Sequence, residues 1–108
     1  MGVTLRAIQK KFKKPDGIIL SYPALNLCLD RFMPSHLLAL DDLILPYSFL
    51  QICLKLYVGD KGRPDVDPFL SPLIIRDEDL AKFPKTRIAV AGRDPLRDDS
   101  FKFALRLM

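Results

Sequence analysis

The chain has 108 residues, of which 49% are hydrophobic and 28% are charged. This length limits it to one domain, and this composition excludes an intrinsically disordered chain. No apolar run approaches the ~20 residues that a membrane-spanning helix needs, and we expect no signal peptide.

The net charge of +4 comes from one short segment. Residues 1–14 carry basic side chains and no acidic ones, whereas the two kinds nearly balance in the remainder. A solvated helix end accounts for this cluster better than nucleic-acid binding, because interleaved aromatic side chains are missing. A membrane-surface helix is a weaker alternative, since its apolar face would be narrow. We therefore expect no nucleic-acid partner and no transmembrane segment.

The first predicted element is a helix over residues 3–12. Leu5, Ile8 and Phe12 share one face of it, with basic side chains off that face. No capping residue precedes the helix, so we expect it to be the tail of a longer one.

The first predicted strand covers residues 18–22, after a turn at 15–17 and before Pro23. Its apolar run is continuous and does not alternate with polar residues. Such a run is typical of a strand that is covered on both faces, as in a parallel sheet.

The segment between the two predicted strands is a mostly helical excursion. Residues 24–45 are irregular apart from a short helical turn at 36–40. Pro46 can begin a helix at its first position and Gly59 can end it. Apolar side chains at helical spacing predict the buried face of that helix: Phe49, Ile52, Cys53 and Leu56. A turn-rich loop follows over 60–72.

The last third of the chain predicts a helical turn, a strand and a helix. The turn covers 77–83, and the second strand covers 86–92. Asp94 and Pro95 then open a helix that reaches the C-terminus. Its predicted apolar stripe consists of Phe101, Ala104, Leu105 and Met108.

Cys28 and Cys53 lie in apolar stretches and form no C-x-x-C motif. We interpret them as buried free thiols in a reducing compartment, in preference to a disulfide. No pattern of metal ligands or cofactor motif is present, so we expect no cofactor and no metal.

The fold class follows from the element order of helix, strand, helical excursion, strand and helix. Two buried strands joined by a helical connection predict an α/β fold with a parallel pair. A sheet of two strands would leave both edges unpaired, so we expect its neighbouring strands to lie outside this chain. Exposed edges also predict self-association.

Asp94 is the candidate catalytic residue. It follows a buried strand at the carboxyl end, where open α/β sheets place their functional side chains. Pro95 stiffens the turn, and a carboxylate held there can accept the Nδ1–H of a histidine and stabilise its imidazolium. The same order of strand, Asp, Pro and helix is also an ordinary helix start. Spacing alone leaves both interpretations open.

Asp94-Pro95-Leu96-Arg97-Asp98 resembles the D-P-L-x-D segment around the acid of the hormone-sensitive-lipase family of esterases. Further segments resemble the family in the same order, at 4–7, 15–18 and 22–24. The segments that resemble the eukaryotic members in particular are 35–40, 45–46, 57–59, 71–73 and 94–107. The resemblance implies that residues 1–108 form a partial α/β-hydrolase domain. That part would run from the helix after the nucleophile to the helix after the triad acid.

By this resemblance Asp94 is the acid of a Ser-His-Asp triad. The family hydrolyses carboxylic esters through an acyl-serine, which implies acylglycerols or other acyl esters as substrates. The resemblance also implies a cytoplasmic location, with the lipid-droplet surface as an alternative for the complete enzyme.

The sequence departs from the family where the nucleophile and base should stand. None of its serines lies in G-x-S-x-G, and H-G-G-G is missing. The only histidine, His36, precedes Asp94, against the family order. We interpret it as partly exposed or hydrogen-bonded, in preference to a catalytic role. We therefore expect the isolated chain to be inactive. The alternative is a non-catalytic relic or interaction fragment.

Overall fold

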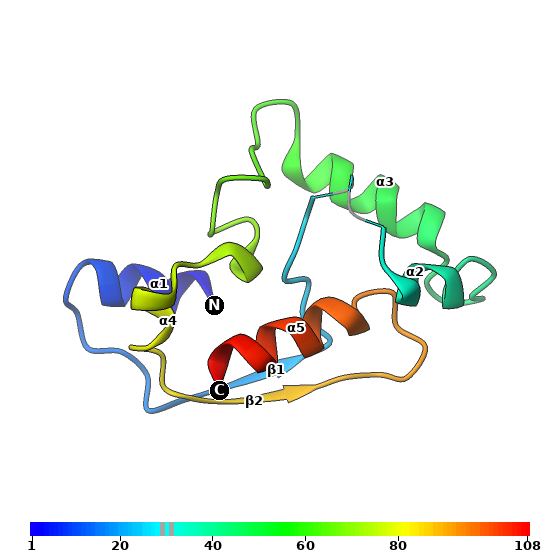
Figure 1. Cartoon of the computed structure of the whole chain (residues 1–108). Helices are drawn as coiled ribbons and strands as arrows, with labels where there is room; N and C mark the ends of the chain where they lie inside the picture. The colour runs from blue at the N-terminus through cyan, green and yellow to red at the C-terminus, as the bar shows by residue number, and fades with distance from the viewer. Residues whose placement is uncertain (29, 31) are drawn as a thin grey trace.

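The computed structural model describes every residue except Leu29 and Arg31, and it arranges the chain around two parallel strands (Figure 1). The elements in chain order are α1 (Gly2–Gln9), β1 (Gly17–Ser21), α2 (Pro34–Leu38), α3 (Tyr47–Val58), the 3₁₀ helix η1 (Pro72–Ile74), α4 (Asp77–Leu80), β2 (Lys85–Ala89) and α5 (Arg97–Leu107). The predicted order of helices and strands is confirmed. No helix in this described part of the chain is long and apolar enough to cross a bilayer.

The strands β1 and β2 pair in parallel over their full lengths, ending with Ser21 opposite Ala89. The amide of Tyr22 still donates to the carbonyl oxygen of Ala89 at 3.0 Å. Pro23 comes next and has no amide hydrogen, so the ladder stops there. The parallel pair was predicted correctly, but the second strand is shorter than the predicted 86–92.

Only one face of this sheet is covered within the described chain. Leu20 and Ile88 pack against the main core, on the side where α5 lies (Figure 1). Side chains alternate along a strand, so Ile19 points the other way and is 76% exposed. The prediction of strands covered on both faces is therefore wrong for this chain.

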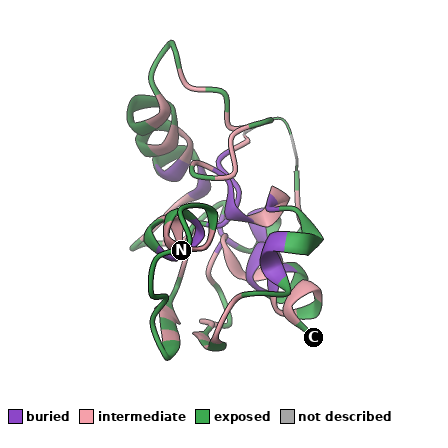
Figure 2. Ribbon diagram, turned by 90° about the vertical axis from the view of Figure 1, so that its left-hand side faces the viewer, coloured by how far each residue is buried: buried purple, intermediate pink, exposed green. Residues whose placement is uncertain are grey.

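The main core joins segments from both ends of the chain. Its buried members are Leu5, Leu25, Ile75, Leu80 and Phe103. They come from α1, α4, α5 and two connecting segments, and Figure 2 shows the buried residues gathered between those elements. The core therefore holds α5 over the sheet, and the turn that precedes α5 is held with it.

The helix α3 buries a different face from the one predicted. Phe49, Cys53 and Leu56 are exposed, whereas Tyr47 and Leu50 are buried in a second, smaller core. Apolar residues occupy both sides of this helix, so helical spacing identifies two stripes and does not say which one packs inward.

The predicted stripe on α5 is wrong for the same reason. Phe101, Leu105 and Met108 are exposed, whereas Phe103 is completely buried. The covered face of α5 is thus set by one large residue packed between α1, α4 and the sheet. The predicted stripe remains an uncovered apolar surface of this chain.

The helix ends follow backbone rules that the sequence indicates in part. Gly59 ends α3 as predicted, with a φ of 63° that suits glycine. Pro46 is the N-cap of α3 and not its first helical residue. The helix α1 ends at Gln9 and not at Phe12, because the chain turns at Lys11, whose φ is 57°.

Both cysteines are free, as predicted, but their predicted burial is wrong. Cys53 is exposed on the outer face of α3, and Cys28 is half-buried. Phe49 and Leu56, which were predicted to share a buried face with Cys53, are exposed as well.

Candidate active site

The carboxyl ends of β1 and β2 lie at the same edge of the sheet because the strands are parallel. Tyr22 begins the exit from β1 with a φ of 49°, a left-handed conformation that bulky residues rarely adopt. The chain leaving β2 passes through 90–93 to Asp94 and then enters α5 beside α2 (Figure 1). This edge therefore carries a strained residue and the predicted acid.

Asp94 lies in a turn and not at the helix start. Its Oδ1 accepts a hydrogen bond from the amide of Leu96 at 2.8 Å, and its carbonyl oxygen accepts one from Arg97 at 3.1 Å. The first helical residue is Arg97, so the prediction that Asp94 and Pro95 open the helix directly is wrong. The carboxylate stabilises a two-residue turn before the helix.

The Asp94 carboxylate can accept further hydrogen bonds besides the one in that turn. The side chain is half-buried, and a carboxylate has about four acceptor positions. One bond to a backbone amide fixes its orientation and leaves room for a further donor such as an imidazole N–H. The structural role of Asp94 in the turn and the catalytic interpretation are thus compatible in this geometry.

Arg97 forms a partly buried ion pair with Asp98 and also contacts the other side of the same loop. The Nη1 of Arg97 donates to the carbonyl oxygen of Gly92 at 2.8 Å, and its Nε donates to Oδ1 of Asp98 at 3.2 Å. These bonds bridge the two sides of the turn that contains Asp94. The loop is therefore held as a closed unit at the edge of the sheet.

The helix α2 contacts this loop through Ser35. The Ser35 hydroxyl donates to the carbonyl oxygen of Pro95 at 2.8 Å, and its amide donates to Oδ2 of Asp98 at 2.8 Å. The sequence reasoning assigned no special role to Asp98 and none to Ser35. Only the resemblance over 35–40 pointed to this segment, and no local pattern predicts a contact of such long range.

The environment of Asp98 favours its charged form. Burial raises the pKa of this carboxyl, but the hydrogen bonds from Ser35 and Arg97 outweigh burial and hold the pKa below its usual value. Asp98 is therefore an anion near neutral pH and a strong acceptor for the Ser35 amide.

His36 serves the structure of α2. It is buried, its Nδ1 accepts the Met33 amide at 3.1 Å, and its ring stacks on Tyr47 with centroids 4.3 Å apart. Burial lowers the pKa of His36, and the charge of Asp98 opposes this shift in part. Among the described residues, no hydrogen bond or ion pair joins His36 to Asp94. The prediction of a hydrogen-bonded histidine is confirmed.

The buried serines are engaged with backbone groups. Ser71 accepts the amide of Leu27 at 3.1 Å, and Ser100 donates to the carbonyl oxygen of Leu96 at 3.1 Å. Ser35 contacts Pro95 as described above. None of these hydroxyls is paired with a base that could activate it as a nucleophile.

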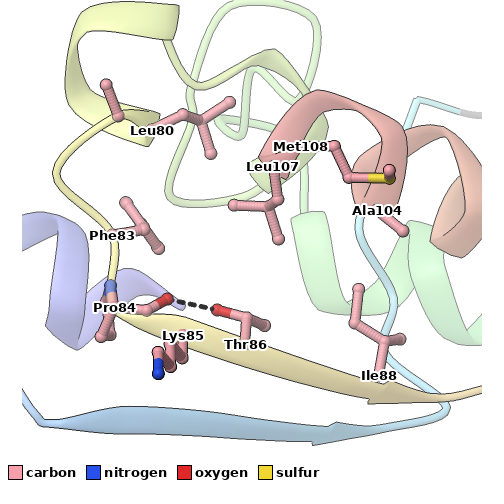
Figure 3. Close-up of a pocket in the computed structure, with 10 residues that line it drawn as sticks. Leu80, Phe83, Pro84, Lys85, Thr86, Ile88, Ala104, Leu107 and Met108 are labelled. Atoms are coloured by element: carbon pink, nitrogen blue, oxygen red, sulfur yellow. Dashed lines mark hydrogen bonds between the residues drawn. The ribbon is translucent and has the colours of Figure 1, made fainter.

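An apolar groove lies at the opposite end of the sheet. Figure 3 shows Phe83, Ile88 and Leu107 around it, with the Thr86 hydroxyl donating to the carbonyl oxygen of Pro84 at 3.0 Å. This groove lies near the amino end of β2, at Pro84, Lys85 and Thr86, whereas Asp94 comes after the carboxyl end of that strand. It is therefore separate from the candidate active site.

A family model described as the alpha/beta hydrolase fold matches residues 1–108. The chain belongs to the α/β-hydrolase family. An esterase of Acinetobacter venetianus strain RAG-1 is 35% identical over 107 residues, which is 95% of this chain and 32% of that protein. The hormone-sensitive lipase of Bos taurus is 42% identical over 67 residues, which is 60% of this chain and 9% of that protein. The predicted resemblance to hormone-sensitive lipases is therefore confirmed.

A solved structure supports the same family assignment. The carboxyl esterase 2 of Tuber melanosporum is similar with a TM-score of 0.81 and 30% identity, covering 98% of this chain and 34% of that one. The predicted partial α/β-hydrolase fold, with two parallel strands and flanking helices, is confirmed. The chain spans about a third of the length of this α/β hydrolase and of the bacterial esterase.

Proposed function

We propose that this chain is the acid-bearing part of a carboxylic-ester hydrolase that acts through a Ser-His-Asp acyl-enzyme mechanism. The observation that carries the proposal is the position of Asp94. It lies in a turn after the carboxyl end of β2 that hydrogen bonds from Ser35 and Arg97 stabilise, and its Oδ1 accepts the Leu96 amide. The family and its esterase relatives support the reaction class.

The role of Asp94 in such a reaction is electrostatic and geometric. It would accept the Nδ1–H of the triad histidine, hold that tautomer, and stabilise the imidazolium that forms when the serine loses its proton. The serine oxygen would attack the ester carbon, and the alcohol would leave with the proton from the histidine. Water would then hydrolyse the acyl-serine by the same proton transfers in reverse.

The isolated chain should be inactive on esters under this proposal. A carboxylate alone supplies neither a nucleophile nor a base, and no serine of the chain lies in G-x-S-x-G. Acylglycerols and related acyl esters are the substrates that we propose for the complete enzyme. Its proposed location is the cytoplasm or the lipid-droplet surface, as for the lipases that it resembles.

A chimera tests this proposal directly. The aligned segment of the Acinetobacter venetianus esterase is replaced by residues 1–108, and hydrolysis of a p-nitrophenyl acyl ester is measured. We expect activity in the chimera and none in the isolated chain. A folded chimera without activity, as judged by circular dichroism and thermal melting, contradicts the proposal.

A non-catalytic interaction fragment is the alternative, and the uncovered apolar faces favour it. Ile19 on the sheet is 76% exposed, and Leu56 on α3 is 78% exposed. Such surfaces promote self-association. Sedimentation velocity of the isolated chain measures this self-association. Concentration-dependent oligomers together with an inactive chimera support the interaction fragment. An active chimera excludes the interaction fragment.

A further inference from the structure

The turn that carries Asp94 is held by a residue far away in the sequence. Ser35 donates to Pro95, one residue after Asp94, and to Asp98, four residues after it. The two bonds span 60 and 63 residues of chain. A single residue of α2 therefore fixes two points of the turn and of the first helical residues behind it.

The two bonds act on the chain that follows Asp94, at Pro95 and at Asp98. The Pro95 ring already fixes φ at that residue, so the direction of its carbonyl group depends on ψ. The Ser35 hydroxyl holds that carbonyl oxygen, while the Ser35 amide holds the side chain of Asp98. Ser35 is completely buried, so water does not replace either bond readily.

We propose that Ser35 and Asp98 are positioning residues that hold the Asp94 carboxylate in the geometry its partner histidine requires, an inference that rests on the proposed function. Neither residue touches the reacting atoms. They act on Asp94 through Pro95 and through the start of α5. Arg97 completes the support by joining Asp98 to the carbonyl oxygen of Gly92 on the other side of the turn.

The chain itself provides a test that is independent of activity. Amide hydrogen exchange by NMR is measured in the 108-residue chain and in Ser35→Ala, which removes the hydroxyl bond to Pro95. The amide of Leu96 reports on the turn because it donates to Asp94. We expect its exchange to speed up by about tenfold relative to amides in the middle of α5.

Ser71→Ala is the matched control for that experiment. Ser71 is also completely buried and also makes a long-range bond, to the amide of Leu27. Its loss should destabilise the chain but leave Leu96 exchange unchanged relative to α5. Equal effects of the two substitutions on Leu96, or none, overturn the positioning role.

The chimera then tests the consequence for catalysis. Ser35→Ala and Asp98→Asn should each lower kcat by about 10-fold to 100-fold with little change in KM, because a misplaced acid harms the transition state and not substrate binding. In the pH profile of kcat, the fall on the acid side should also move to lower pH. A poorly placed carboxylate stabilises the imidazolium less and so lowers the pKa of the triad histidine.

The outcomes separate the two proposals. An unchanged fall on the acid side of that profile, together with an unchanged kcat in Ser35→Ala, overturns the positioning role and leaves the esterase proposal intact. A folded but inactive parent chimera contradicts the esterase proposal, while the exchange of Leu96 still decides whether Ser35 holds the turn.

Discussion

The guanidinium of Arg106 donates to the carbonyl oxygen of Ile75 at 2.5 Å and so joins the last turn of α5 to the segment before α4. The same side chain donates to the carbonyl oxygen of Leu73 and pairs with Asp77. These bonds close the core on the side away from Asp94. Arg106 is not part of the predicted apolar stripe of this helix, and no pattern in the sequence indicates this contact.

We expect Arg106→Met to lower the free energy of unfolding by roughly 1–3 kcal/mol. Methionine keeps most of the apolar stem but leaves backbone carbonyl oxygens without their charged donor. The exposed pair with Asp77 should contribute little to this loss. Urea unfolding followed by circular dichroism measures the effect, and Lys102→Met, on the exposed side of α5, is the control that should change stability little.

Phe103 and Phe101 offer a matched pair on one helix. Phe103 is completely buried, whereas Phe101 is 54% exposed. Phe103→Ala should cost about 3–5 kcal/mol of unfolding free energy, because it removes apolar contacts and leaves a cavity. Phe101→Ala should cost well under half of that. Equal losses in urea unfolding would show that the predicted stripe, and not Phe103, carries the packing of α5.

The stability of the chain should fall as the pH drops through the range in which histidine titrates. The pKa of His36 is lowered by burial below its ordinary value of about 6.5. The folded state therefore prefers neutral His36, so its contribution is present above about pH 6.5 and is lost as the pH falls through the folded pKa. Protonation also removes the Nδ1 acceptor for the Met33 amide.

The variant His36→Asn checks this pH dependence. Asparagine keeps an acceptor oxygen for the helix start but cannot be protonated in this range. Melting temperatures between about pH 7.5 and 5 should fall more steeply for the native chain than for the variant. Parallel curves for the two proteins contradict a role for His36 titration.

In an active chimera, Asp94→Asn should lower kcat by about 10⁴-fold, the loss found when the triad acid of a serine protease is replaced by its amide. The amide oxygen can still accept the Leu96 hydrogen bond, so the turn itself should persist. Asp65→Asn is the control, because Asp65 is an exposed residue paired with Arg63 at 2.9 Å in a surface loop. Retention of near-full turnover in Asp94→Asn would remove this residue from the triad.

Much of the candidate site followed from the sequence because local chemistry dictates it. Pro95 after Asp94 predicted a stiff turn beyond the second strand, and the structure has one. The boundaries were less accurate. The helix begins two residues later than predicted: Asp94 accepts the Leu96 amide in a turn, and the first helical residue is Arg97.

The sequence by itself determined the order of elements, the parallel strand pair and the placement of Asp94 beyond β2. The order of elements and the placement of Asp94 depend on residues only a few positions apart, such as the apolar runs, Pro23 and Gly59. The parallel direction follows from the helical connection between the two strands. The tertiary structure alone decided that Phe103 packs inward and that Ser35 meets Pro95. Those contacts depend on the path of the whole chain, which brings together residues that no local pattern relates.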